Sequence, residues 1–540
     1  MSAASPLKKP AKPGKESAKP TRRLLGVIDV GARAIRLEIA ETGPGDKLRI
    51  LDTLTHPVAL GKDTFGEGQI SRETIEQCVR ILQSYRTVLG EYGLTTDSSV
   101  RAVATSAVRE AGNRDFFLDR IFMATGFDLV CLDEVELNRL TYLAVRDLLM
   151  RQRIRAPSRL LVLDVGGGTT EALFLEKSRV TFSETYRMGA LRSRERFETL
   201  DAPEHRLRSV LTQDIEHTIE RMRHALPRQT IPYMIAMSTD ARLAAARLEP
   251  AWEELEVARF PFSVFSEYCE RIARLSLDEV VRACGITYAE AETFGTALLT
   301  IREIARAFGV RHLLVPKASL RTALEIDLAG RPSWTAHLRE QIEQAACTLG
   351  EKFHFDLRHA RYVAGLCDRL FEELQTEHGL NASYGFLLRI AAFLHEIGLF
   401  ISNRNHHKHS LYLILNSDLF GLSRNEIQLI ALIARYHRRS PPSALHPDLR
   451  DLPRDRRLVL FKLSAILRVA DALARSNPKP ISSLQFEKKP GRLKITCRGA
   501  DDLSLERLAL QEKGDWFEDV YGMAVELRSG PLLKESESNV

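Results

Sequence analysis

A short glycine-rich segment carries the clearest chemistry in this sequence. Residues 164–171 read DVGGGTTE, in which three consecutive glycines precede two threonines. Glycines leave backbone N–H groups unobstructed and adopt the conformations that a phosphate-binding loop needs, and threonine hydroxyls add further donors. The segment therefore predicts phosphate contacts from Gly166, Gly167, Gly168 and Thr169. A glycine hairpin without a ligand is the alternative.

Two carboxylates flank the glycines. Asp164 and Glu171 supply hard oxygen ligands, which suit Mg²⁺ bridging to phosphate oxygens. We therefore predict that these two residues hold Mg²⁺ or another divalent cation.

The same pattern occurs earlier in the chain, so the segment belongs to an internal repeat. Residues 26–41 read GVIDVGARAIRLEIAE and residues 161–176 read LVLDVGGGTTEALFLE. A constant offset superposes Asp29 on Asp164. Both copies give an apolar strand, an Asp-x-Gly turn and a second apolar strand, and a helical pattern follows each, at residues 72–92 and 205–225.

Two such halves predict a duplicated α/β fold that closes around a cleft, with both acidic turns facing each other. This is the plan of the actin-like ATPase (ribonuclease H-like) fold, in which phosphates bind between paired hairpins. Chance similarity between two buried hairpins is the alternative. The pattern becomes mostly helical after about residue 330 and ends in short β-like segments. The expected divisions are a disordered basic tail (1–22), two α/β subdomains (23–135 and 136–330), a helical domain (331–478) and a small α+β region (479–540).

Composition sets the broad class. The chain has 540 residues, of which 44% are hydrophobic and 27% charged, as in ordinary globular proteins. The net charge of +6 is concentrated in the N-terminal tail, which we interpret as a solubilising leader or, alternatively, a contact for a polyanion. The seven cysteines are scattered, no apolar run is long enough to span a bilayer, and no signal peptide is evident. We therefore expect a cytoplasmic protein.

Four segments together resemble the exopolyphosphatase/guanosine pentaphosphate phosphatase (Ppx/GppA) family. DVGGGTTE is similar to the family's DIGGGSTE signature, and AVATSAVREAGNRDFFLDRI (102–121) to its ATSALREARN segment. YRMGALRSRERF (186–197) resembles PLGAVRLTERF, and CLDEVELNRL (131–140) stands at the place of SGEEEARL. The four occur in the family's order and spacing.

The resemblance implies metal-assisted attack of water on a terminal phosphorus. The register set by Arg139 and Leu140 makes Glu136 the catalytic general base. Further phosphate contacts are implied for Thr105, Ser106, Arg109, Gly31 and Arg33.

Two loops depart from the family's pattern. The first hairpin reads DVGARAIR at residues 29–36 where the family has DLGSNSFR, so serine and asparagine groups are replaced around Arg33. Residues 238–242 read STDAR in place of GGTAR, and we expect Asp240 to repel phosphate. Slow turnover, a changed substrate or binding without hydrolysis follow as alternatives.

The helical half resembles the HD-like domain of long family members. In metal-dependent HD proteins, histidines and aspartates in this order hold metal, but Glu396 stands here in place of one aspartate. We therefore expect His359, His395 and Asp471 to form a structural network without metal. A basic run includes residues 404–409 and 435–439 and is interpreted either as a polyphosphate-attracting surface or as an ordinary solvated surface.

The function implied is an exopolyphosphatase that releases orthophosphate from inorganic polyphosphate. Hydrolysis of guanosine pentaphosphate is the second enzymatic reading, and a weakly active polyphosphate- or nucleotide-binding regulator is the third. A homodimer is expected by resemblance, without membrane or specific nucleic-acid binding.

Overall fold

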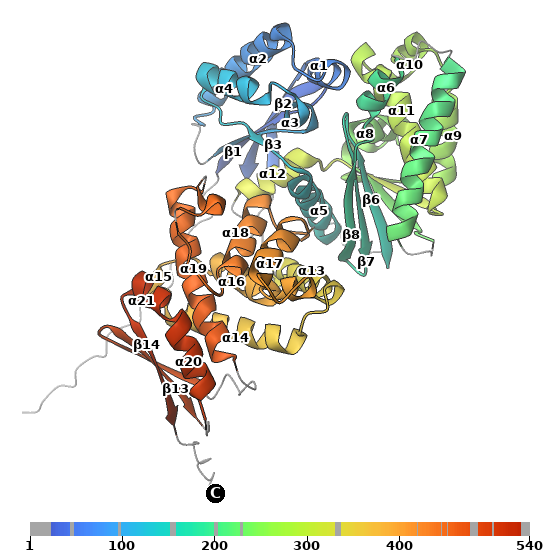
Figure 1. Cartoon of the computed structure of the whole chain (residues 1–540). Coiled ribbons are helices and arrows are strands. Elements are labelled where there is room, and N and C mark those ends of the chain that lie inside the picture. Colours follow the sequence, from blue (N-terminus) through green and yellow to red (C-terminus); the bar gives the residue numbers. More distant parts are fainter. Residues whose placement is uncertain are drawn as a thin grey trace, which may run out of the picture.

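The computed structural model describes residues 23–530, apart from 44–47, 95–98, 152–157, 199–203, 227–229, 330–335, 418, 444, 451, 476–483 and 499–501. The predicted basic tail therefore lies outside the described residues. Two α/β lobes stand side by side, and a mostly helical body packs below them and ends in a small sheet (Figure 1).

The first lobe is built on a five-stranded mixed sheet of order β3-β2-β1-β4-β5. β1 is buried along nearly its whole length, because it lies inside the sheet between β2 and β4, whereas the edge strand β3 is largely exposed. Ser71 caps the long helix α2 by accepting a hydrogen bond from the N–H of Thr74. The elements of this lobe are β1 (Leu24–Val30), β2 (Ala34–Thr42), β3 (Leu48–Pro57), α1 (Leu60–Glu67), α2 (Arg72–Glu91), β4 (Val100–Ala104), α3 (Ser106–Glu110), α4 (Arg114–Thr125) and β5 (Val130–Cys131).

The second lobe repeats this plan on a six-stranded sheet of order β10-β11-β9-β6-β7-β8. Its elements are β6 (Arg159–Val165), β7 (Thr170–Glu176), β8 (Arg179–Tyr186), α6 (Ala190–Glu198), α7 (Glu204–Ala225), β9 (Tyr233–Ala236), α8 (Thr239–Leu248), η2 (Trp252–Glu254), β10 (Val257–Pro261), α9 (Phe262–Ile272), α10 (Leu277–Cys284), α11 (Tyr288–Ala307) and β11 (His312–Pro316).

The two hairpins confirm the predicted duplication. β1 pairs antiparallel with β2, which places Asp29 opposite Arg36, and β6 pairs antiparallel with β7, which places Asp164 opposite Glu171. The same offset that aligns the two sequences therefore aligns the two registers.

Two helices join the lobes at the centre of the molecule. α5 (Glu134–Arg151) packs against β7 and β8 of the second lobe, and α12 (Leu320–Leu328) returns to pack on α5, β1 and β4. Both lie between the lobes and above the helical body (Figure 1). α12 follows the second lobe in the sequence but packs on β1 and β4 of the first lobe. The two lobes therefore do not correspond to two consecutive segments of the chain.

The helical body buries a continuous apolar core around α16 and α19. One segment, Ala382–Phe400, is long and apolar enough to cross a membrane by length and composition, contrary to the expectation from sequence, and 61% of it is buried inside the fold. The elements are α13 (Ala336–Lys352), α14 (Leu357–Glu373), α15 (Gln375–His378), α16 (Ala382–Leu394), η3 (Ile397–Phe400), α17 (His406–Leu415), α18 (Arg424–Arg435), η4 (Pro447–Leu449) and α19 (Arg454–Leu473).

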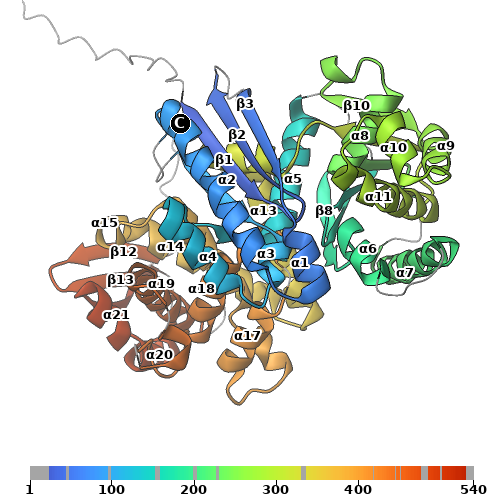
Figure 2. The ribbon, with the colours of Figure 1, turned by 90° about the horizontal axis from the view of Figure 1, so that it is seen from above.

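The chain closes with the predicted small β-containing region. β12 (Leu484–Lys489) and β13 (Arg492–Arg498) form a hairpin, and β14 (Ala524–Gly530) adds to β13 in parallel. α20 (Ser504–Lys513) and α21 (Asp515–Tyr521) pack this sheet against α19. Figure 2 shows the small sheet on the far side of the helical body from the second lobe.

Candidate active site in the cleft between the lobes

A cavity of about 150 Å³ opens where the two hairpins approach each other. Its walls come from both lobes, from the start of α5 and from the loop before α12. The lining residues are Asp29, Gly31, Ala32, Arg33, Arg36, Thr105, Ser106, Leu137, Asp164, Val165, Gly166, Gly167, Thr169, Glu171, Met237, Thr239, Arg242, Ser319, Leu320 and Arg321.

Most residues predicted to contact phosphate lie on this cavity. They are Gly31, Arg33, Thr105, Ser106, Gly166, Gly167 and Thr169, together with the two predicted metal ligands, Asp164 and Glu171. They converge because the turns β1–β2 and β6–β7 point into the same space.

Two predicted contacts lie elsewhere. Gly168 is packed so closely that an added Cβ would lie 2.5 Å from the Ser106 hydroxyl, and its carbonyl accepts a hydrogen bond from Arg192 at 2.7 Å. Arg109 donates to the backbone carbonyl of Leu132 at 2.7 Å. Both therefore hold the walls of the cavity and do not line it.

The carboxylates of the cavity lie in a poorly solvated environment. Burial raises the pKa of Asp164 although Arg242 opposes the shift, and the charge of Asp29 adds to it. Burial also raises the pKa of Glu171, and the neighbouring Asp164 raises it further. The two acidic turns therefore face each other as predicted.

The donor set of the cavity fits a divalent cation. Among the described residues, Glu171 Oε1 and Asp29 Oδ1 are buried oxygens without a hydrogen-bond partner. Buried carboxylate oxygens without donors are costly unless a cation or proton satisfies them. Of the two predicted ligands, Glu171 thus has an unsatisfied oxygen for a cation, and Asp29 offers another. The predicted role of Asp164 stays a prediction.

Three arginines that were not predicted as ligands also line the cavity: Arg36, Arg242 and Arg321. Arg321 lies 3.0 Å from Glu38 and 3.6 Å from Asp29. Burial lowers the pKa of Arg242 to about 10, so this side chain remains charged at neutral pH. β2 also carries Glu38 and Glu41, so a charge in this strand did not by itself mark Arg36 as a cavity residue.

The two altered loops contact each other across the cavity. Both terminal nitrogens of Arg33 bind the carboxylate of Asp240, at 3.3 and 3.0 Å, and one also binds the Thr293 hydroxyl. Asp240 is fully buried. It was expected to repel phosphate, whereas here its charge is compensated by the arginine that replaces a polar residue in the first loop.

Glu136 does not lie where its predicted role requires. Its carboxylate accepts two hydrogen bonds of 2.8 Å from Arg139, one turn later in α5. It lines a separate interdomain pocket with Asp327 and Glu426. The prediction that Glu136 orients the attacking water is therefore wrong in its placement, because this side of α5 faces away from the cavity.

The next residue of α5 faces the cavity instead. Leu137 lines the wall between the two hairpins and is 7% exposed. Successive residues of an α-helix are rotated by about 100°, so only one of positions 136 and 137 can point into the cavity. The cavity thus has an apolar side chain where α5 approaches it.

The basic run of the helical body is not a continuous basic surface. His406, His407 and His437 are buried, and the guanidinium of Arg438 contacts the ring of His406. Arg435 pairs with Asp448 at 3.1 Å. These contacts make part of the run internal, while Arg404, Lys408 and Arg439 are exposed. Whether these exposed residues attract polyphosphate or form an ordinary solvated surface stays a prediction.

Comparisons with known proteins identify the family. Residues 38–329 match the Ppx/GppA phosphatase family, and residues 342–516 match domain III of Ppx/GppA phosphatases. The first match alone covers more than half of the chain. The chain therefore belongs to the Ppx/GppA phosphatase family.

A solved structure of similar fold supports the architecture of the two lobes. An exopolyphosphatase from Cytophaga hutchinsonii is 21% identical over 57% of this chain and 98% of its own, with a TM-score of 0.51. The Aquifex aeolicus member of the Ppx/GppA family is 19% identical over 58% of this chain and 100% of its own, with a TM-score of 0.49.

Proposed function

We propose that this chain binds the terminal phosphates of inorganic polyphosphate in the cavity between the lobes and hydrolyses the last phosphoanhydride bond slowly. The observation that carries the proposal is the convergence, on one cavity, of a glycine hairpin, a buried carboxylate pair and several arginines. Membership of a phosphatase family supports the reaction class.

The cavity supplies the positioning and charge stabilisation that phosphoryl transfer needs. The backbone N–H group of Gly167 would hold a phosphate oxygen, while that of Gly166 closes the hairpin by donating to the carbonyl of Thr169. The guanidinium groups of Arg36, Arg242 and Arg321 would neutralise charge that develops during bond cleavage. Asp164 and Glu171 would hold a divalent cation, which, when bound, polarises the phosphoryl group.

We expect hydrolysis to be slow because the side of α5 that faces the cavity carries no general base. A positioned general base contributes a factor of about 10² to 10⁴, and Glu136 is held by Arg139 away from the cavity. Leu137 can exclude bulk water but cannot accept a proton. The remaining carboxylates, Asp29, Asp164 and Glu171, must therefore orient water without a dedicated base.

Polyphosphate fits the cavity better than guanosine pentaphosphate does. The volume of about 150 Å³ suits phosphate groups, and the lining residues that the structure describes include no aromatic side chain on which a base could stack. A guanosine would therefore have to lie outside the cavity. The magnesium requirement and the homodimer remain predictions.

A second candidate is a protein that binds polyphosphate without hydrolysing it. Leu137 favours this candidate, because the position that could carry the base is apolar. Both candidates share the same binding site and differ only in turnover.

The proposal is tested by measuring orthophosphate release and binding together. Long-chain polyphosphate and guanosine pentaphosphate are incubated with Mg²⁺ and wild type, Glu171→Gln or the surface control Arg120→Ala. We expect slow release from polyphosphate that Glu171→Gln abolishes and Arg120→Ala preserves. Binding without release from either substrate would establish the second candidate, and absence of binding would reject both.

A further inference from the structure

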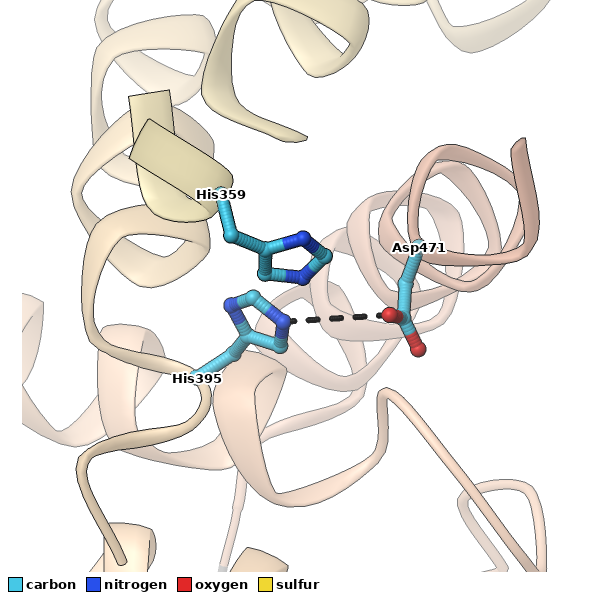
Figure 3. A group of neighbouring side chains, drawn as sticks. All are labelled: His359, His395 and Asp471. Carbon is cyan, nitrogen blue, oxygen red and sulfur yellow. Dashed lines mark ion pairs between the residues drawn. The ribbon is translucent and has the colours of Figure 1, made fainter. Parts of the chain in front are cut away.

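The helical body gathers three potential metal ligands from three helices. His359 lies in α14, His395 directly follows α16, and Asp471 lies in α19; one ligand atom from each falls within 4.8 Å of the others. Figure 3 shows the two imidazole rings and the carboxylate converging on one space. This cluster is remote from the cleft and plays no part in the proposed hydrolysis.

His395 is oriented as a ligand. Its Nδ1 lies 2.7 Å from the backbone carbonyl of Ala392, so Nδ1 carries the proton that this contact needs and Nε2 presents its lone pair. In the described part of the chain, Nε2 has no hydrogen-bond partner although the side chain is fully buried. A backbone carbonyl that fixes the tautomer in this way is the usual support of a metal-bound histidine.

The carboxylate opposite is also directed into this space. Asp471 Oδ1 lies 3.8 Å from His395 Nε2, while Oδ2 is bonded to the Lys513 ammonium. The distance of 3.8 Å is too long for a hydrogen bond. It is close to the separation of roughly 3.3 Å between two ligands of a tetrahedral ion with bonds of about 2.0 Å. A contraction of about half an ångström would bring both atoms to one ion.

Glu396 does not prevent such a site. Its carboxylate lies 3.7 Å from His359 Nε2, and both residues are partly exposed. Asp471 supplies the third ligand, so the carboxylate of Glu396 is not needed to bind the ion. The exposed side next to His359 gives an ion access from solvent.

We propose that His359, His395 and Asp471 bind one divalent first-row transition ion, for which Zn²⁺ is the natural probe. Two neutral imidazoles and one carboxylate favour such an ion over Mg²⁺ or Ca²⁺, which prefer oxygen ligands. The ion would tie three helices together. This proposal replaces the expectation of a structural network without metal, which stays untested.

The test uses the full chain after removal of metal with a chelator, in the presence of excess Mg²⁺ to occupy the cleft. Zn²⁺ is titrated in competition with a chromophoric chelator, and Co²⁺ is added separately to follow its visible absorption. We expect one equivalent of Zn²⁺, a tetrahedral Co²⁺ spectrum and a rise in Tm on Zn²⁺ addition.

His359→Ala is the diagnostic variant, because this side chain is partly exposed and its loss should leave the fold intact. We expect its Zn²⁺ affinity to fall by at least about tenfold, with the Co²⁺ spectrum lost. His354→Asn is the matched control, since it removes an exposed histidine of the same domain and asparagine tolerates the positive φ found there. Absence of stoichiometric Zn²⁺ binding in wild type, or equal binding in His359→Ala and wild type, would overturn the proposal.

Discussion

Arg33 of the first lobe and Asp240 of the second form an ion pair of 3.0 Å across the cleft. Both residues lie in loops that depart from the family's pattern, and the pair connects the tips of β1–β2 and α8. Asp240 has almost no exposed side-chain surface, whereas Arg33 retains 17%. A buried carboxylate of this kind needs its partner, so the two departures are best understood as one compensated change.

Removing the charge of Asp240 should strengthen phosphate binding. Asp240→Asn leaves Arg33 free to contact an anion and eliminates one negative charge beside the cavity. We expect polyphosphate affinity to rise by roughly tenfold, or about 1.4 kcal/mol, as measured by titration calorimetry. Asp115→Asn, at an exposed position, controls for net charge. Unchanged or weaker binding by Asp240→Asn would show that the pair does not compete with substrate.

Magnesium should stabilise the protein more at high pH than at low pH. Burial raises the pKa of both Asp164 and Glu171, so the folded state holds these protons more tightly than the unfolded state, whose carboxyl pKa values lie near 4. Stability from this pair is therefore present at low pH and lost as pH rises through the raised values.

Mg²⁺ competes with the protons bound to Asp164 and Glu171. The increase in Tm that Mg²⁺ causes should therefore grow between about pH 5 and about pH 8. Thermal unfolding with and without Mg²⁺ measures the effect. Glu171→Gln should have a higher Tm than wild type at about pH 8 without metal, and a much smaller response to Mg²⁺. A Mg²⁺ shift that is independent of pH, or that persists in this variant, would place the ion elsewhere.

Arg36 should contribute directly to binding. It lines the cavity, and its guanidinium lies 4.0 Å from the carboxylate of Asp29. Arg36→Ala should weaken polyphosphate binding by at least about tenfold, because a hydrogen bond to a charged group contributes about 1.5 to 3 kcal/mol. Arg120→Ala, which removes a surface pair with Glu76, should bind like wild type. Equal affinities for the two variants would remove Arg36 from the site.

The hairpins could be predicted from sequence because their signal is local. Glycine, a flanking acid and an apolar strand recur at a fixed offset, and the register of each hairpin follows from that pattern. Arg36 lies in the same hairpin but was not predicted, because its place on the cavity depends on the second lobe.

Other features of the cleft depend on contacts that sequence does not reveal. Arg33 and Asp240 are 207 residues apart, and each alone resembles a lost phosphate contact. For Glu136, the sequence register was anchored on Arg139 and Leu140, but a single-residue difference at the start of α5 decides which side chain enters the cavity. The ion pair between Glu136 and Arg139 then stabilises the orientation that excludes this glutamate.

The cluster in the helical body could be named from sequence but not measured. Resemblance to HD-like proteins pointed to His359, His395 and Asp471, and only the fold shows that their ligand atoms lie within 4.8 Å of one another. Metal binding there stays a proposal.

Slow hydrolysis is proposed to occur in a cavity whose wall includes Leu137. The most direct measurement is the initial rate of orthophosphate release from polyphosphate with Mg²⁺, compared among wild type, Leu137→Glu and the uncharged control Leu137→Gln. Supplying a carboxylate at this position should raise the rate by at least about 100-fold, while Leu137→Gln stays near wild type and Glu136→Gln releases phosphate at the wild-type rate. A Leu137→Glu variant no faster than Leu137→Gln, or a loss of release in Glu136→Gln, would contradict the account.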